Sequence, residues 1–138
     1  MPAKDVFHDA VKNALVKDGW KITDDPLKLE LGGKDLYVDF GAEELLAAER
    51  EERKIAVEVK SFVGPSEMTD LERALGQYVL YSEVLNVTEP DRVLYLAIPH
   101  KVLFDLFEQP LGKLLLEKQG LRLIGFDPMR EEIVKWTP

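Results

Sequence analysis

Three residues in the middle of the chain have the types and the spacing needed for metal-assisted hydrolysis. The stretch 55–62 alternates, so Glu58 and Lys60 share one face of an expected β-strand, roughly 6.5–7 Å apart. Asp39 ends an earlier alternating stretch, and pairing of the two strands would place it about 5 Å across from that face. Two carboxylates at such a distance repel each other unless a cation lies between them.

This arrangement predicts a site for a hard divalent cation, Mg²⁺ or Mn²⁺. The carboxylates of Asp39 and Glu58 and the backbone carbonyl of Val59 supply the oxygen ligands that such ions prefer. A bound cation lowers the pKa of a water molecule and neutralises charge on a phosphate. Lys60 would orient the attacking water. The competing interpretation is a plain ion pair of Glu58 and Lys60, which would stabilise the fold by only ~0–1 kcal/mol.

Two further groups of polar residues have both a functional and a structural interpretation. Gln77 and Tyr81 are four residues apart on an expected helix, so they lie on one flank of it, either supporting a site or at the edge of the core. His8 lies on the polar face of the first expected helix. We expect a solvated or capping role for it, the alternative being that it leans over a site. His100 is expected at a helix start.

Composition limits the class of protein. The chain has 138 residues, which suits a single domain over 1–138, and it contains no cysteine and only two histidines. Disulfides and thiolate metal sites are therefore excluded. No apolar run approaches the ~20 residues of a membrane helix, so a cytoplasmic protein is expected. The net charge of −8 argues against non-specific DNA binding, which usually needs a basic surface.

The order of expected elements indicates an α/β domain with a mixed sheet and helices on both faces. A strand, a long helix and a buried strand in succession favour a parallel crossover. The hairpin at Gly32-Gly33 is expected to make the sheet mixed. The expected helices are 4–18, 42–53 (short), 69–86 with Thr69 as cap, 100–108 and 110–119; the expected strands are 27–31, 36–40, 54–62, 92–98, 121–126 and 133–136, with 20–25 a connector.

The candidate residues resemble the motif of the PD-(D/E)xK nuclease superfamily. Asp39 is followed by eighteen intervening residues and then Glu58-Val59-Lys60, although Val38 stands where that motif has proline. The resemblance implies a restriction-endonuclease-like, three-layer domain with a central mixed β-sheet flanked by helices. It also implies that the acidic pair binds the metal and that the lysine assists the water. Gln77 and Tyr81 resemble the Gln-x-x-x-Tyr motif of RecB-like nucleases, which supports the site and contacts the nucleic-acid backbone.

At a finer level the chain resembles the XisH family of cyanobacterial excision controlling factors. The resemblance implies a factor for programmed excision of a DNA element, acting on DNA with a site-specific recombinase and a small XisI-like companion protein. The segments that carry it are 3–8, 17–20, 38–43, 55–62 and 74–78.

Three functions remain open at this level. The Asp39, Glu58 and Lys60 set favours a Mg²⁺-dependent endonuclease. The acidic charge favours a binding module that keeps the nuclease fold and regulates a recombinase through protein contacts. A third alternative is the nuclease of a toxin–antitoxin-like pair, held inactive by its companion. An open strand edge at 133–136 would also allow a homodimer.

Overall fold

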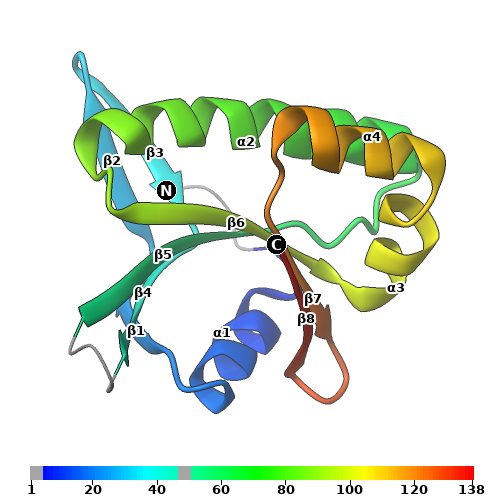
Figure 1. Ribbon diagram of the computed structural model, residues 1–138, viewed down its shortest axis with the longest axis horizontal. Coiled ribbons are helices and arrows are strands. Elements are labelled where there is room, and N and C mark those ends of the chain that lie inside the picture. The colour runs from blue at the N-terminus through cyan, green and yellow to red at the C-terminus, as the bar shows by residue number, and fades with distance from the viewer. Residues whose placement is uncertain (1–4, 47–50) are drawn as a thin grey trace.

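The computed structural model of the protein describes residues 5–46 and 51–138. A six-stranded mixed sheet lies between helices on both of its faces, as expected from the sequence (Figure 1). The helical segments are α1 (His8–Lys17), α2 (Glu67–Thr88), α3 (His100–Val102), the π-helix η1 (Leu103–Phe107) and α4 (Pro110–Gln119). The strands are β1 (Lys21–Asp24), β2 (Leu27–Leu31), β3 (Lys34–Val38), β4 (Phe40–Leu46), β5 (Glu51–Val59), β6 (Arg92–Pro99), β7 (Leu123–Asp127) and β8 (Glu132–Thr137).

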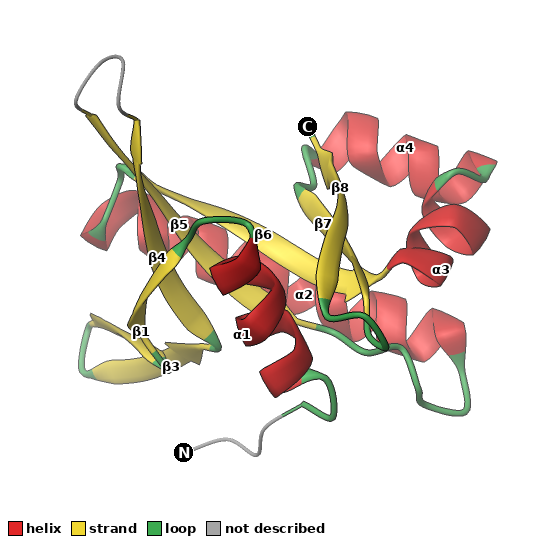
Figure 2. Ribbon diagram, turned by 90° about the horizontal axis from the view of Figure 1, so that it is seen from below, coloured by secondary structure: helices red, strands yellow, loops and turns green. Residues whose placement is uncertain are grey.

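The large sheet is built around three parallel strands. Its order is β1-β4-β5-β6-β7-β8, in which β5, β6 and β7 are parallel and the outer pairings are antiparallel. Parallel neighbours require crossover connections. α2 provides one and the α3–η1–α4 segment provides the other, and both cover the same face. α1 crosses the opposite face (Figure 2). The predicted parallel crossover is therefore confirmed.

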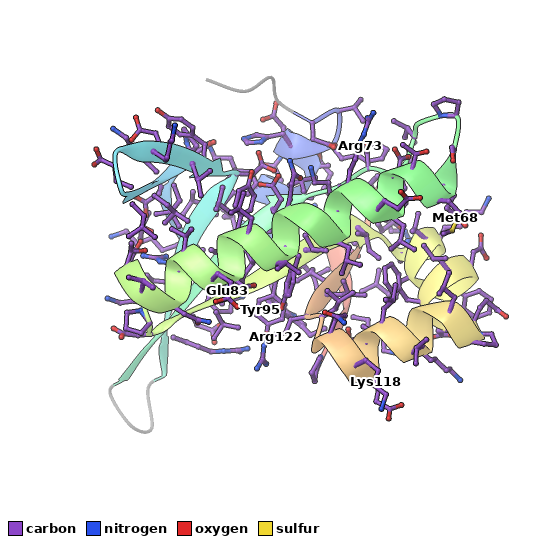
Figure 3. The ribbon with its side chains drawn as sticks, turned by 90° about the horizontal axis from the view of Figure 1, so that it is seen from above. Met68, Arg73, Glu83, Tyr95, Lys118 and Arg122 are labelled. Carbon is purple, nitrogen blue, oxygen red and sulfur yellow. The ribbon has the colours of Figure 1, made fainter. Side chains whose placement is uncertain are left out.

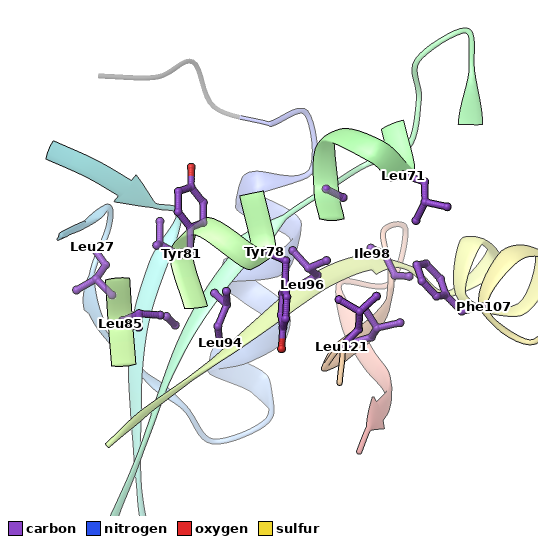
Figure 4. Close-up of a cluster of buried hydrophobic side chains, with 14 of the residues drawn as sticks. Leu27, Leu71, Tyr78, Tyr81, Leu85, Leu94, Leu96, Ile98, Phe107 and Leu121 are labelled. Carbon is purple, nitrogen blue, oxygen red and sulfur yellow. The ribbon is translucent and has the colours of Figure 1, made fainter. Parts of the chain in front are cut away.

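Each face of the sheet has its own apolar core. The alternation in β5 sends Ile55, Val57 and Val59 toward α1 and leaves Ala56 and Glu58 on the side of α2. The hairpin β2–β3 closes the α2 core at one end, where Leu27 lies near Leu85 (Figure 4). Among the described residues, no helix has the length and apolarity needed to cross a membrane.

Two predictions about the first third of the chain are wrong because local propensity yields to sheet pairing. The expected connector 20–25 contains the edge strand β1. The expected helix 42–53 is instead strand, with β4 and β5 pairing antiparallel, and positions 47–50 lie outside the described residues. Cross-strand partners carry opposite charges there: Glu43 faces Lys54 and Glu44 faces Arg53. Such pairs stabilise a sheet, so charge that suggested a solvated helix serves strand pairing instead.

The expected strand 36–40 is broken at Asp39. β3 ends at Val38 and β4 begins at Phe40, with a bend between them. Val38 belongs to the core under α2, whereas Phe40 belongs to the core under α1. The hairpin β2–β3 therefore forms a separate two-stranded sheet, and the large sheet is mixed because of β1, β4 and β8. The chain changes sheets at the first candidate carboxylate.

Other element boundaries also differ from expectation. The first helix begins at His8, whereas 4–18 was expected, and β5 ends at Val59, so Lys60 follows the strand that was expected over 54–62.

Two helices further along the chain also differ from expectation. Ser66, not Thr69, caps α2, because its hydroxyl accepts a hydrogen bond from the Thr69 N–H at 3.2 Å. The expected helix 100–108 consists of the short α3 and the π-helix η1. The predicted helix from Pro110 to Gly120 is confirmed, and Gly120 ends it in the left-handed conformation.

A matched pair of glycine substitutions tests how α4 packs on η1. A Cβ at Gly112 would lie 2.3 Å from both the Leu106 carbonyl oxygen and Phe107 Cα, whereas one at Gly76 in α2 meets nothing within 4 Å. We expect Gly112→Ala to lower the free energy of unfolding by about 1–3 kcal/mol through overpacking. Gly76→Ala should raise it by about 0.5–1 kcal/mol. Urea denaturation measures both, and equal effects would contradict this packing.

Candidate active site

Asp39 and Glu58 hold each other through the backbone. The Asp39 N–H donates to Glu58 Oε1 at 3.1 Å, and the Val59 N–H donates to Asp39 Oδ2 at 2.8 Å. The ladder between β4 and β5 reaches the pair Phe40 and Val57, and beyond it these side-chain bonds replace backbone pairing. The bend at Asp39 therefore places the two carboxyl groups together, as the sequence predicted, although by a turn of the chain and not by a continuous strand.

Burial makes this acidic pair expensive to ionise. Glu58 is only 6% exposed, and burial together with the negative charge of Asp39 raises its pKa to about 8. The Lys60 ammonium, with Nζ 3.4 Å from Glu58 Oε2, opposes that rise. Burial also raises the pKa of Asp39, despite the Val59 N–H bond and the nearby cations. A divalent cation is the kind of ligand that would relieve this repulsion.

The prediction that His8 is solvated or capping is wrong, because His8 is 4% exposed and faces the acidic pair. Its Nε2 lies 2.9 Å from Asp25 Oδ1, and its Nδ1 lies 3.8 Å from Asp39 Oδ1. Within the described part of the chain, Nδ1 is buried without a hydrogen-bond partner. The signal was present in the sequence: His8 shares the helical spacing of the buried Val11 and Leu15.

Asp25 fixes the orientation of this imidazole. Burial would raise the pKa of Asp25, but hydrogen bonds from Lys12 and His8 outweigh burial and lower the pKa. Lys12 Nζ lies 2.9 Å from the second carboxylate oxygen. An ionised carboxylate only accepts hydrogen bonds, so the Nε2 of His8 carries the proton. In the neutral ring Nδ1 then presents a lone pair toward Asp39, as in histidines that bind metals.

Asp39, Glu58 and His8 fit a divalent cation that takes oxygen and nitrogen ligands from the protein and keeps several bound waters. The donor atoms would be the carboxylates of Asp39 and Glu58 and the orphaned Nδ1 of His8. These three side chains do not converge as a ready-made cage, and neither does any other group of three histidine or acidic side chains among residues 5–46 and 51–138. A cation with few protein ligands and retained waters, such as Mg²⁺ or Mn²⁺, therefore suits the site better than a fully enclosed one.

Tyr81 is the second residue of α2 predicted for the site, and it lies beside the acidic pair. It is 8% exposed, and burial plus the charges of Glu58 and Asp39 raise its pKa to about 12. The Tyr81 and Tyr78 hydroxyls point to opposite sides of the core (Figure 4). Gln77 lies one turn before Tyr81 and is half-buried, with a buried Oε1 that has no hydrogen-bond partner among the described residues.

A small hollow of about 220 Å³ opens beside Lys60. Arg73 of α2 lines it from the side of the helix that faces the N-terminal segment, opposite Arg122 (Figure 3). Two acids also line it, but their carboxylates are engaged by the backbone. Asp5 accepts from the Phe7 and Ser61 N–H groups, and Asp70 accepts from the Gly64 N–H. The hollow is thus lined by two carboxylates held by the backbone and by two cations, Lys60 and Arg73, whose side chains are the groups in it that suit an anion.

The fold and the site together define a three-layer α/β protein with a buried acidic pair and a lysine at the end of a central parallel strand. The chain belongs to the XisH family, because the family model for XisH protein matches residues 1–134. The crystal structure of an XisH family protein from Nostoc punctiforme is similar, with 39% identity, a TM-score of 0.88, and coverage of 97% of this chain and 100% of the other.

A second crystal structure extends the comparison. An fdxN element excision controlling factor protein from Anabaena variabilis is 41% identical, with a TM-score of 0.87 and coverage of 98% of this chain and 100% of that one. No curated protein matches the chain.

The raised pKa of Glu58 predicts a pH-dependent gain in stability for Glu58→Gln in the absence of metal. Between pH 4.5 and about 8 the folded protein keeps a proton that the unfolded chain releases, so ionisation destabilises the fold as pH rises. Glu58→Gln removes that penalty. The pKa rises from 4.5 to about 8 and one pKa unit is worth ~1.4 kcal/mol, so the variant should be more stable by up to about 5 kcal/mol at pH 8.5 and equal to wild type near pH 4.5.

Urea denaturation in EDTA across this pH range measures the difference. The control is Glu83→Gln, an exposed glutamate on α2, which should follow wild type at every pH. A gain for Glu58→Gln that does not depend on pH would contradict the buried acidic pair.

Proposed function

We propose that this protein is an endonuclease-like excision controlling factor of the PD-(D/E)xK type, which hydrolyses DNA phosphodiester bonds with Mg²⁺ or Mn²⁺. The observation that carries the proposal is the buried, mutually bonded pair of Asp39 and Glu58 with Lys60 beside it. Membership of the XisH family, and the similar protein described as an fdxN element excision controlling factor, support the role in excision of a DNA element.

Asp39, Glu58 and His8 would hold the cation, with the Val59 carbonyl as a further ligand. When bound, the cation would supply positive charge to the attacking water and to the phosphate. Its arrival would also offset the repulsion between the two carboxylates and release the proton that Glu58 otherwise retains near neutral pH. Asp25 would keep the His8 ring oriented, which is the part that hydrogen-bonded partners play at metal sites.

Lys60, Arg73 and Tyr81 would act on the DNA side of the site. Lys60 would hold the attacking water and stabilise charge that develops on the phosphate. Arg73 lines the hollow next to Lys60 and would contact a neighbouring phosphate. With a pKa of about 12, Tyr81 keeps its proton and can donate a hydrogen bond, with Gln77 supporting the same flank. A local cluster of cations would thus bind DNA despite the net charge of −8.

A second candidate function is a catalytically silent factor that regulates a site-specific recombinase through protein contacts. The net charge of −8 favours it. So does the ion pair of Lys60 and Glu58, which occupies one of the carboxylate oxygens. In either role the proposed partners are the recombinase and an XisI-like companion protein. If the protein is instead the nuclease of a toxin–antitoxin-like pair, the companion would hold the nuclease inactive. β8 lies at one edge of the sheet, where a homodimer would form.

Cleavage of supercoiled plasmid and of single-stranded DNA in Mg²⁺ or Mn²⁺ tests the enzyme directly. We expect wild type to cut in a metal-dependent way and Lys60→Ala to lose about 10²-fold or more in rate, because a cation aimed at the transition state is removed. The matched control is Lys34→Ala, an exposed lysine on β3, which should cut like wild type.

Two outcomes would contradict this proposal. No cutting by folded wild type, with the companion protein absent, would favour the regulatory function. Equal cutting by wild type and Lys60→Ala would mean that the activity does not belong to this site. Growth arrest on expression of the chain alone, relieved by Lys60→Ala, would favour the toxin–antitoxin-like pair.

Metal affinity tests the assignment of His8. Calorimetric titration should show Mn²⁺ binding by wild type and none by the double variant Asp39→Ala/Glu58→Ala. We expect His8→Ala to weaken Mn²⁺ about tenfold or more. The same substitution should weaken Mg²⁺ binding less, because imidazole suits transition metals better than Mg²⁺. The matched control is His100→Ala, the other histidine, which lies near the Phe126 carbonyl. Unchanged Mn²⁺ affinity in His8→Ala would remove His8 from the ligand set.

A further inference from the structure

A large groove lies at the carboxyl ends of the three parallel strands, where open α/β sheets commonly bind ligands. Its volume is about 820 Å³. Ser61 and Val63 contribute to it just after β5, Pro99 at the end of β6, and the turn from Asp127 to Arg130 after β7. Neither Asp39 nor Glu58 lines it, so the groove is distinct from the candidate metal site.

The groove presents large apolar side chains to solvent. Phe104 is 63% exposed, Val63 is 68% exposed and Met129 is 90% exposed, and all three line the groove. Phe7 adds a half-buried aromatic ring to the same surface. A contiguous apolar surface of this kind is unusual on a protein that acts alone, and it marks interaction sites. Aromatic and methionine side chains are enriched at protein interfaces.

Phe104 points outward from the π-helix η1. Leu103, Leu106 and Phe107 of η1 are buried in the core, while Phe104 between them is not. The wider turn of a π-helix changes the helical spacing, and such turns occur frequently at functional sites. Gly112 lets α4 pack closely against this turn, which fixes the position of η1. The exposed ring is therefore held on a rigid support and not on a loose loop.

The charge at the rim of the groove is opposite to that of the protein. Lys101 and Arg130 line the groove and are exposed, and neither forms an ion pair with another described residue. Asp127 also lines it, and its carboxylate accepts hydrogen bonds from the Met129 and Arg130 N–H groups at 2.9 and 3.0 Å, so the rim carries two cations and one carboxylate. An apolar floor with a cationic rim is complementary to an apolar segment that carries acidic side chains.

We propose that this groove binds a partner protein, through a segment whose large apolar side chains are flanked by aspartate or glutamate. Single-stranded nucleic acid is less complementary, because it needs a row of stacking rings along a basic track. Among the lining residues only Phe104 and His100 are exposed rings, and Nδ1 of His100 lies 3.2 Å from the Phe126 carbonyl oxygen. A second copy of this chain would bring another net charge of −8 to the contact.

Docking in the groove would contact the segment that carries Lys60. Ser61 follows Lys60 directly and lines both the groove and the hollow beside Lys60. The Asp5 carboxylate ties the Ser61 and Phe7 N–H groups together, which joins one wall of the groove to that segment. A bound partner would thereby be placed next to the candidate site. The docking itself does not rest on nuclease activity, and binding alone measures it.

Selection from a displayed library of random dodecamer peptides on the immobilised full chain tests the proposal. We expect the selected peptides to combine Leu, Phe or Trp with Asp or Glu and to bind with micromolar affinity by fluorescence anisotropy. Phe104→Ser should weaken the best of them tenfold or more, and Lys101→Glu/Arg130→Glu should do the same. The matched control is Val87→Ser, which removes a 66% exposed valine outside the groove and should leave affinity within twofold of wild type.

Phe104→Ser changes an exposed side chain, so its circular dichroism and melting temperature should match those of wild type. Several results would overturn the proposal: no enriched peptide, selected peptides that are basic, or affinity that is insensitive to Phe104. Binding of a single-stranded oligonucleotide that depends on Phe104 would assign the groove to nucleic acid. A wild-type dimer that Phe104→Ser converts to monomer in solution would assign it to a second copy.

Discussion

The exchange of hydrogen bonds between Asp39 and Glu58 is the constraint on which the site depends. The Glu58 carboxylate accepts a hydrogen bond from the Asp39 N–H, and the Asp39 carboxylate accepts one from the Val59 N–H. These two bonds take the place of the next backbone pair in the ladder between β4 and β5. The same bonds hold the bend where the chain leaves the small sheet for the large one. Fold and site are therefore one feature, because the residues that fix the junction of the sheets are also those that would hold the cation.

Burial changes the protonation of the acidic pair, which is the property that matters for its chemistry. A pair of carboxylates in water would simply ionise, whereas here burial and mutual repulsion raise the pKa of Glu58 to about 8. The folded chain accepts this penalty, with Lys60 as partial compensation. Perturbed carboxyl groups of this kind occur mainly at functional sites. His8, oriented by Asp25, places its unpartnered Nδ1 3.8 Å from the Asp39 carboxylate, which a purely structural pair would not require.

The candidate metal site and the apolar groove share one end of the sheet for a topological reason. Parallel strands end together, so the segments that follow β5, β6 and β7 meet at one edge. The segment 60–63 belongs to both surfaces, with Lys60 toward the acidic pair and Val63 toward the apolar groove. A partner docked in the groove would therefore lie against the segment that carries Lys60.

The sequence alone determined the alternation of β5 and the fold class, because the periods of strands and helices are local properties. The sequence also predicted the meeting of Asp39, Glu58 and Lys60 through the spacing of a motif that resembles a known one. It could not determine the bend at Asp39, the strands in 20–25 and 42–53, or the burial of His8. Those depend on which strands pair and on which face each helix packs against, and both are contacts between distant residues. The apolar groove likewise exists only because tertiary packing brings three strand ends and η1 together.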